Sequence, residues 1–191
     1  MTMKLSKVII VLSSLFILVV TSFLHPWITL FFGVSLFQTS DKPKITYGEF
    51  PFTLTYELNG EKSVIEDTII CEYEGVMNRG TAGKARKWSA TLKSGREQLT
   101  LLDLRSQKEQ NELKQTVLEL YFYYGSGAYY MGDEKNTFAR EAQGFDWIEY
   151  RYQTEEGTIG GSAYRADEAW AKYRIRLISW ECAPPIKNTF K

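Results

Sequence analysis

The chain has 191 residues, of which 44% are hydrophobic and 24% are charged, a composition typical of a folded protein. Its 23 basic and 23 acidic side chains cancel at pH 7. Because only Lys4 and Lys7 lie before residue 41, residues 41–191 hold 21 basic and all 23 acidic residues, a net charge of −2. A near-neutral domain lacks the positive field that attracts nucleic acid, so we expect no nucleic-acid partner.

A long apolar segment lies near the N-terminus. From Val8 to Phe37 there are thirty consecutive residues without Asp, Glu, Lys or Arg. An α-helix needs about 20 apolar residues to cross the hydrocarbon core of a bilayer. The run therefore predicts a transmembrane anchor over residues 8–37, with the lipid bilayer as its partner. Because proline lacks a backbone N–H, we expect the spanning helix to end or kink at His25-Pro26.

The charges around this segment predict its orientation. Lys4 and Lys7 precede it, and the positive-inside rule then places residues 1–7 in the cytoplasm. Residues 41–191 would form one domain outside the membrane, since about 150 residues is the usual size of a domain with one core. We thus expect a single-pass protein of the cell membrane with its N-terminus inside.

A cleaved signal peptide is the main alternative to an anchor, because the two lysines also suit the start of a signal sequence. The apolar part of a signal peptide usually spans about 7–15 residues and ends at a small-x-small site. The best such site, Val20-Thr21-Ser22, is poor, and apolar sequence continues beyond it, so we favour an uncleaved signal-anchor. The sequence contains no Asn-x-Ser/Thr, which favours a bacterial envelope over a eukaryotic secretory compartment.

After the anchor, the sequence predicts mostly β-strands. Phe52, Leu54, Tyr56 and Leu58 alternate with polar residues. Asn59-Gly60 follows at once, and this pair is preferred in two-residue hairpin turns. Further strands bounded by Gly, Asn or Asp are expected at residues 64–73, 87–92, 96–104, 117–124, 128–131, 146–154 and 174–182.

Two short helices are expected between these strands. Ser106 and Glu109 have the spacing of a capping box and predict a helix to about Lys114. Asp167 is expected to cap a second helix over Glu168–Tyr173. The sequence therefore predicts a mainly β fold, a single extracytoplasmic β-sandwich or open-barrel domain with one or two short helices, preceded by the transmembrane helix.

Aromatic residues crowd the segment LELYFYYGSGAYYMGDE, residues 118–134. In its first half, apolar residues alternate with Glu119, Tyr121 and Tyr123, which predicts a strand with one face in the core and its tyrosines on a more solvated face. Gly125-Ser126-Gly127 is expected to form the turn of a hairpin. Most of the cluster is thus interpreted as structural, and only the far end of the hairpin is left to touch a partner.

Composition excludes several chemistries. The only histidine, His25, lies in the apolar segment, which removes Ser-His-Asp and Cys-His catalysis and histidine-containing zinc sites from the domain. The segment Gly157–Ser162 is rich in glycine but lacks the Lys-Ser/Thr of a phosphate-binding loop, and it is interpreted as a flexible loop. We therefore expect no catalytic, cofactor-binding or metal-binding residues and no cofactor.

One enzymatic alternative stays open. A pair of carboxylates can hydrolyse glycosidic bonds without a histidine. The acidic residues available for this are Asp133, Glu134, Asp146, Glu149, Glu155 and Glu156. Because carboxylates occur on every soluble surface, we interpret them as solvated charge rather than as a catalytic pair.

The two cysteines, Cys71 and Cys182, both lie in the domain. In an oxidising compartment they could form a disulfide, which would close a loop of about 110 residues and contribute roughly 4–5 kcal/mol. The alternative is a pair of buried free thiols that pack as small apolar side chains. The sequence leaves both interpretations open.

Two surfaces are predicted to contact partners. The first is the aromatic and acidic set at the far end of the expected hairpin and beyond it, namely Tyr129, Tyr130, Asp133 and Trp147. The second is a basic loop that could approach an anionic surface, with Arg79, Lys84, Arg86 and Lys87. The alternative for this loop is that its charges only keep it soluble.

The leading functional hypothesis is a membrane-anchored, non-catalytic interaction domain that serves as an accessory partner of another membrane or envelope protein. The first alternative is an envelope glycan-binding module that stacks sugar rings on Tyr129, Tyr130 or Trp147. The second alternative is the carboxylate-based hydrolase described above.

Overall fold

The computed structural model describes the chain at residues 2–32, 41–79 and 83–191. Within the first range, side chains are described for residues 9–27. The fold is mainly β, with 46% of the residues in strands, which confirms the predicted fold class. The strands form two four-stranded sheets that follow an N-terminal apolar helix.

The N-terminal helix α1 (Thr2–Phe32) belongs, together with residues 75–86, to a compact unit distinct from the rest of the chain. Its segment Ile9–Trp27 is long and apolar enough to cross a membrane. The helix does not end at His25-Pro26, as one form of the prediction had it, because it continues through Pro26 to Phe32. The last residues of the predicted anchor, 33–37, lie outside the described residues.

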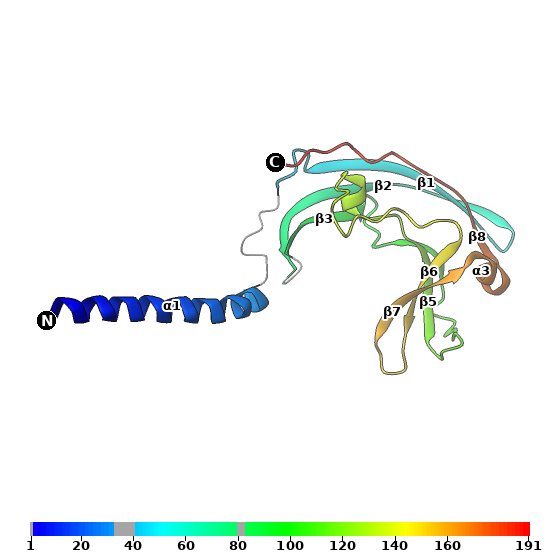
Figure 1. Cartoon of the computed structure of the whole chain (residues 1–191). Helices are drawn as coiled ribbons and strands as arrows, with labels where there is room; N and C mark the ends of the chain where they lie inside the picture. Colours follow the sequence, from blue (N-terminus) through cyan, green and yellow to red (C-terminus); the bar gives the residue numbers. More distant parts are fainter. Residues whose placement is uncertain (1, 33–40, 80–82) are drawn as a thin grey trace. The chain divides into compact units, whose positions relative to one another are not determined.

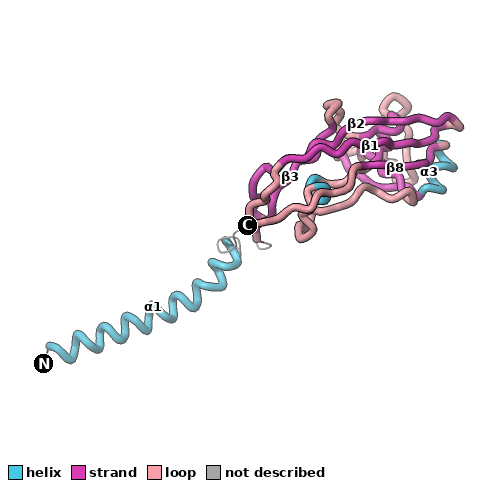
Figure 2. The backbone as a smooth tube through the Cα atoms, turned by 90° about the horizontal axis from the view of Figure 1, so that it is seen from above, coloured by secondary structure: helices cyan, strands magenta, loops and turns pink. Residues whose placement is uncertain are grey.

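The first sheet is a curled, open half-barrel (Figure 1). Its strands lie side by side in the order β3-β2-β1-β8, as Figure 2 shows from above. Their bounds are β1 (Tyr47–Leu58), β2 (Glu61–Asn78), β3 (Lys84–Leu92) and β8 (Ile175–Cys182). The last strand of the chain thus pairs with the first one, in antiparallel register.

The predicted hairpin between β1 and β2 is confirmed. Leu58 pairs with Glu61, and the two residues between them, Asn59 and Gly60, have φ angles of 54° and 86°. These positive angles are those that a two-residue turn of this kind requires, and asparagine and glycine adopt them most readily.

The second sheet has the strand order β4-β5-β6-β7, with each neighbouring pair antiparallel. Its strands are β4 (Leu99–Asp103), β5 (Thr116–Phe122), β6 (Trp147–Gln153) and β7 (Ile159–Arg165). The prediction of a flexible loop at residues 157–162 is wrong, because residues 159–162 belong to β7. A Cβ atom at Gly160 would lie 2.5 Å from the ring of Tyr152, so this strand needs glycine to pair beneath an aromatic side chain.

Both sheets contribute to one hydrophobic core. The first sheet supplies Phe50, Phe52, Leu54, Ile69 and Cys71, and the second supplies Leu99, Val117, Leu120, Phe122 and Ile148. The helix α3 (Ala166–Tyr173) adds Ala169 and Tyr173 to this core. Its existence is confirmed, but Arg165 rather than Asp167 is the N-cap, and the side chain of Glu168 accepts a hydrogen bond from the Arg165 backbone.

The helix predicted from Ser106 to Lys114 is wrong, because these residues form turns. The side chain of Asn111 accepts hydrogen bonds from the backbone N–H groups of Leu113 and Gln115. Lys108 and Lys114 have positive φ angles of 50° and 58°. Local side-chain hydrogen bonds of this type compete with the helical ones, and a capping-box spacing alone does not outweigh them.

The hairpin predicted after residue 124 is also wrong, since the chain forms the short helix α2 (Gly127–Tyr130) instead of a strand. Ser126 is its N-cap, and its side chain accepts a hydrogen bond from the Tyr129 backbone. Gly127 lies against β3, where a Cβ atom would come within 2.3 Å of the Ser89 carbonyl oxygen. The glycine therefore serves a close backbone approach rather than a turn.

We predict that Gly127→Ala destabilises the protein by about 1–3 kcal/mol, because the added methyl group meets backbone that cannot move aside. The matched control is Gly144→Ala, whose Cβ meets nothing within 4 Å and which should change stability by less than about 0.5 kcal/mol. Chemical unfolding of the full chain in detergent measures both. Equal stabilities of the two variants would contradict the packing of α2 against β3.

Candidate functional site

The face of the second sheet that points away from the core is polar and aromatic. Leu120 and Phe122 of β5 are buried in the core, so Glu119, Tyr121 and Tyr123 point to the opposite side, as the alternation in the sequence predicts. Residues directly opposite one another in an antiparallel pair share a face. The outer face therefore comprises Thr100, Glu119, Tyr121, Tyr123, Trp147, Glu149 and Arg151.

Glu119 is the centre of this face and is only 1% exposed, although its strand neighbours on the same face are half-buried. Its Oε2 atom accepts hydrogen bonds from Thr100 Oγ1 at 3.0 Å and from Arg105 Nη2 at 3.1 Å. Its Oε1 atom lies 3.3 Å from Arg151 Nη1. Two guanidinium groups thus converge on one carboxylate, which compensates for its removal from water.

Gln98, which directly precedes β4, adds a contact to this group of residues through Arg151. Its Oε1 atom accepts a 2.7 Å hydrogen bond from Arg151 Nη2, which also fixes which end of the amide is the oxygen. Among the described residues, two buried side-chain atoms have no hydrogen-bond partner, Gln98 Nε2 and Glu119 Oε1. Both residues line a cavity of about 270 Å³ that opens on the outer face.

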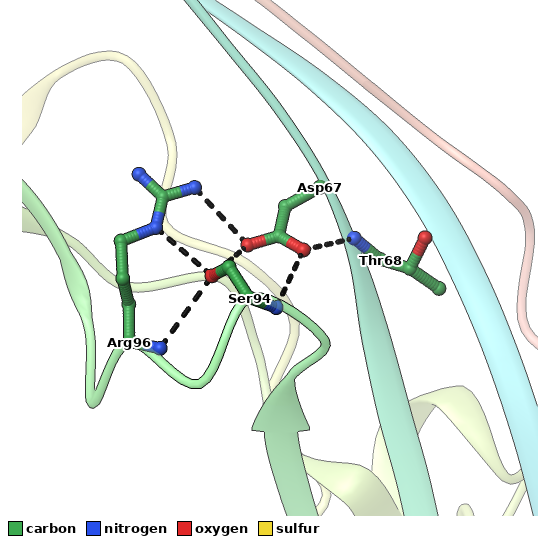
Figure 3. A network of polar contacts seen from close by, with 4 residues as sticks. All are labelled: Asp67, Thr68, Ser94 and Arg96. Atoms are coloured by element: carbon green, nitrogen blue, oxygen red, sulfur yellow. Dashed lines mark hydrogen bonds and ion pairs between the residues drawn. The ribbon is translucent and has the colours of Figure 1, made fainter.

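Arg96 also lines this cavity, and its guanidinium group contacts Asp67 and Ser94 (Figure 3). Its Nη2 atom lies 3.0 Å from Asp67 Oδ2 and its Nε atom donates to Ser94 Oγ at 3.0 Å. Burial alone would raise the pKa of Asp67, but hydrogen bonds from Ser94, Thr68 and Arg96 together outweigh it and lower that pKa. The carboxylate of Asp67 therefore anchors one guanidinium group at the edge of the cavity.

A second cluster occupies the same face farther along β5 and β6. Arg140 Nη2 donates to Glu149 Oε1 at 2.7 Å, and the Arg140 guanidinium lies 4.4 Å from the centroid of the Tyr123 ring. Burial, followed by the charge of Glu149, raises the pKa of Tyr121 to about 12. The phenol of Tyr121 is therefore protonated at neutral pH and acts as a hydrogen-bonding group.

Two of the four residues predicted to contact a partner cannot do so. Tyr130 is 1% exposed and packs on Phe50 in the core, where its hydroxyl donates to the Tyr124 carbonyl. Asp133 is 0% exposed and accepts hydrogen bonds from Trp88 Nε1 at 3.0 Å and Asn136 Nδ2 at 3.1 Å. Both are structural, because the segment forms a packed helix and turn instead of an exposed hairpin end.

The other two predicted contacts remain accessible. Tyr129 is half-buried, with its ring edge-on to Tyr130. Trp147 is 50% exposed and begins β6 on the outer face, because the next residue, Ile148, points into the core. Only Trp147 therefore joins the surface formed around Glu119 and Glu149.

The basic loop lies partly outside the described residues, since 80–82 are not described. Arg86 donates to the Asp41 carbonyl at 3.2 Å, and Lys87 pairs with Glu74 at 2.6 Å. Lys84 is exposed and Arg79 is half-buried. The attraction of this loop to an anionic surface stays a prediction.

The disulfide between the two cysteines is not formed, and both residues are free thiols. Cys71 pairs with Gly48 and Cys182 with Phe52, on opposite sides of β1. Their Cα atoms are therefore separated by at least two strand spacings, about 9–10 Å, because Gly48 and Phe52 are also offset along β1, and this exceeds the reach of a disulfide, about 7 Å. Burial, followed by the neighbouring Cys182, raises the pKa of the Cys71 thiol to about 12.

The sequence does not indicate the partners of Glu119, namely Thr100, Arg105 and Arg151, nor the hydrogen bond from Arg151 to Gln98. The available signal was Glu119 itself, an acidic residue inside an apolar strand. Its partners come from three other segments of the chain, and no spacing rule joins them. Of the six carboxylates considered for hydrolysis, Glu149 alone lies on the outer face, paired with Arg140.

Among the described residues, no group of three or more His, Cys, Asp or Glu side chains is arranged to hold a metal ion. Comparison of the chain with protein-family models, with characterised proteins and with solved structures found no match.

We predict that iodoacetamide at pH 8 leaves Cys71 of the folded chain unmodified, because a buried thiol with a raised pKa presents no thiolate. Half-buried Cys182 should react slowly, and both should react fully after unfolding without a reductant. Mass spectrometry of the peptides measures this. A linked pair of peptides containing both cysteines would contradict the strand register.

We predict that Asp67→Asn lowers the free energy of unfolding at pH 7 by about 1–3 kcal/mol, because charge-assisted hydrogen bonds are lost. The pKa of Asp67 is lower in the folded chain than in the unfolded chain. Its contribution is therefore present above the unfolded pKa, about 3.9, and is lost as the pH falls through the folded pKa.

The difference between the wild-type chain and Asp67→Asn should accordingly shrink below about pH 4. Denaturant unfolding at pH 7 and pH 3 measures it. The matched control is Asp167→Asn, since Asp167 forms an ion pair whose carboxylate is 74% exposed, and it should cost less than about 0.5 kcal/mol. A difference that persists unchanged at pH 3 would contradict the role given to the Asp67 carboxylate.

Proposed function

We propose that this chain is a single-pass membrane protein that presents a non-catalytic β-rich binding domain outside the cell membrane. The segment Ile9–Trp27 supports the anchor, since it is long and apolar enough to cross a membrane. Lys4 and Lys7 before the segment support an N-terminus inside and a domain outside.

The arrangement around Glu119 carries the proposal of binding. A buried carboxylate with two converging arginines, beside a cavity, is a polar site that is organised before any ligand arrives. The outer face continues from there to exposed Trp147 and to the stacked pair of Arg140 and Tyr123. Trp, Tyr and Arg are the residues most enriched at the energetic centres of protein interfaces. The face is therefore suited to a protein partner, and the chain to the role of an accessory subunit.

Binding is favoured over catalysis by the way the acidic groups are used. The domain has no histidine, and Glu119 and Glu149 are each paired with arginine. Asp133, the first of the carboxylates considered for hydrolysis, is 0% exposed and could not meet a substrate without local unfolding.

We predict that a photo-crosslinking residue at Trp147 gives one dominant protein adduct in native membranes, because this side chain lies exposed on the outer face. The control probe is at Val64 of β2, which is 54% exposed but belongs to the first sheet. Mass spectrometry identifies the adducts. The proposal fails if the Trp147 probe gives no protein adduct, or the same adducts as the Val64 probe.

A further inference from the structure

Two residues that line the cavity, Gln98 and Glu119, each have one buried side-chain atom without a hydrogen bond, a donor on Gln98 and an acceptor on Glu119. Gln98 Nε2 donates to no described atom, and Glu119 Oε1, although 3.3 Å from Arg151 Nη1, accepts no hydrogen bond in suitable geometry. Folded proteins leave few buried polar atoms in this condition, because each forgoes its bonds to water. A purely structural ion cluster would have satisfied them, and partly satisfied networks are otherwise unfavourable.

The two atoms define the chemistry of a complementary ligand. Gln98 Nε2 requires an acceptor, and Glu119 Oε1 requires a donor. An ionised carboxylate would satisfy the first atom but not the second, and an ammonium group the second but not the first. A hydroxyl group both donates and accepts, so a ligand that carries hydroxyl groups offers what each of the two atoms requires.

The size of the cavity limits the ligand further. Its volume of about 270 Å³ lies just below the range for drug-sized ligands, roughly 300–1,000 Å³, and far exceeds one water molecule, about 30 Å³. Arg105 and Arg96 at its walls add several N–H donors for further oxygens, and the Asp67 contacts hold Arg96 in place. Several hydroxyl groups on one small frame would use this lining.

We propose that the cavity lined by Gln98, Glu119 and the three arginines binds a polyhydroxylated ligand the size of one sugar ring. The inference rests on the proposed function, because it names a ligand class for the same outer face. It places sugar recognition in a polar cavity, whereas the sequence pointed to aromatic stacking on Tyr129, Tyr130 or Trp147.

The test is saturation-transfer NMR on the full-length chain in nanodiscs, with glucose, N-acetylglucosamine and ribitol as probes. At least one probe should bind, and triethylene glycol dimethyl ether, which accepts but does not donate hydrogen bonds, should not. Gln98→Met should weaken binding at least tenfold, since it removes the unpaired donor while filling the same space. The matched control Gln153→Met, on the same sheet and outside the cavity, should bind as the wild-type chain does.

A second variant keeps the test decisive if Gln98→Met does not fold. Gln98→Glu replaces the donor nitrogen with an acceptor oxygen and adds a negative charge, while it keeps an acceptor for Arg151, and it should also abolish binding. The inference is overturned if none of the three probes binds, or if binding survives both substitutions. Its failure is separable from that of the proposed function, because the protein adduct of the Trp147 probe is measured independently of any sugar.

Discussion

A carboxylate that is withdrawn from water has to be paired, and this requirement organises the outer face of the second sheet. Leaving Glu119 without its arginines would cost about 3–5 kcal/mol. Its contacts with Thr100 and Arg105 tie β5 to β4 and the turn after it, and its pair with Arg151 ties β5 to β6.

The same strand supplies both the core and the outer face. Leu120 and Phe122 of β5 are fully buried between the sheets, while Glu119 and Tyr121 point away from them. The side chain of Glu119, on a strand packed in this way, has little freedom to move. The arginines reach this carboxylate from the surface, which gives the face both a rigid centre and an accessible rim.

The sequence predicts well what depends on neighbouring residues. The alternation in β1, the turn at Asn59-Gly60 and the two faces of β5 from Glu119 onward are local patterns, and the structure has all three. Before Glu119 a register shift in β5 places Val117, rather than Leu118, in the core. The same alternation places Glu119 on the outer face, but it does not indicate that the side chain is buried there. That burial depends on Gln98, Arg105 and Arg151, which the fold brings together from separate segments.

The elements that the sequence predicts wrongly are those that depend on a distant contact. The sequence predicts Gly127 in a hairpin turn, but glycine is required there because α2 meets the backbone of β3 at this residue. Gly160 reads as part of a loop, but it makes room for the Tyr152 ring and allows β7 to pair with β6. The sequence predicts Asp133 on the surface, but its carboxylate is buried and accepts a hydrogen bond from Trp88. In each case, tertiary packing outweighs the local preference of the residue.

The central claim is that the outer face of the second sheet, rather than the first sheet, is the binding surface. Hydrogen–deuterium exchange tests it most directly, by comparing the chain in its native membrane with the chain purified in detergent. The account predicts slower exchange in the native membrane for peptides covering residues 96–105 and 138–153, and no change in β1. Slower exchange confined to the first sheet, or no difference anywhere in the domain, would contradict it.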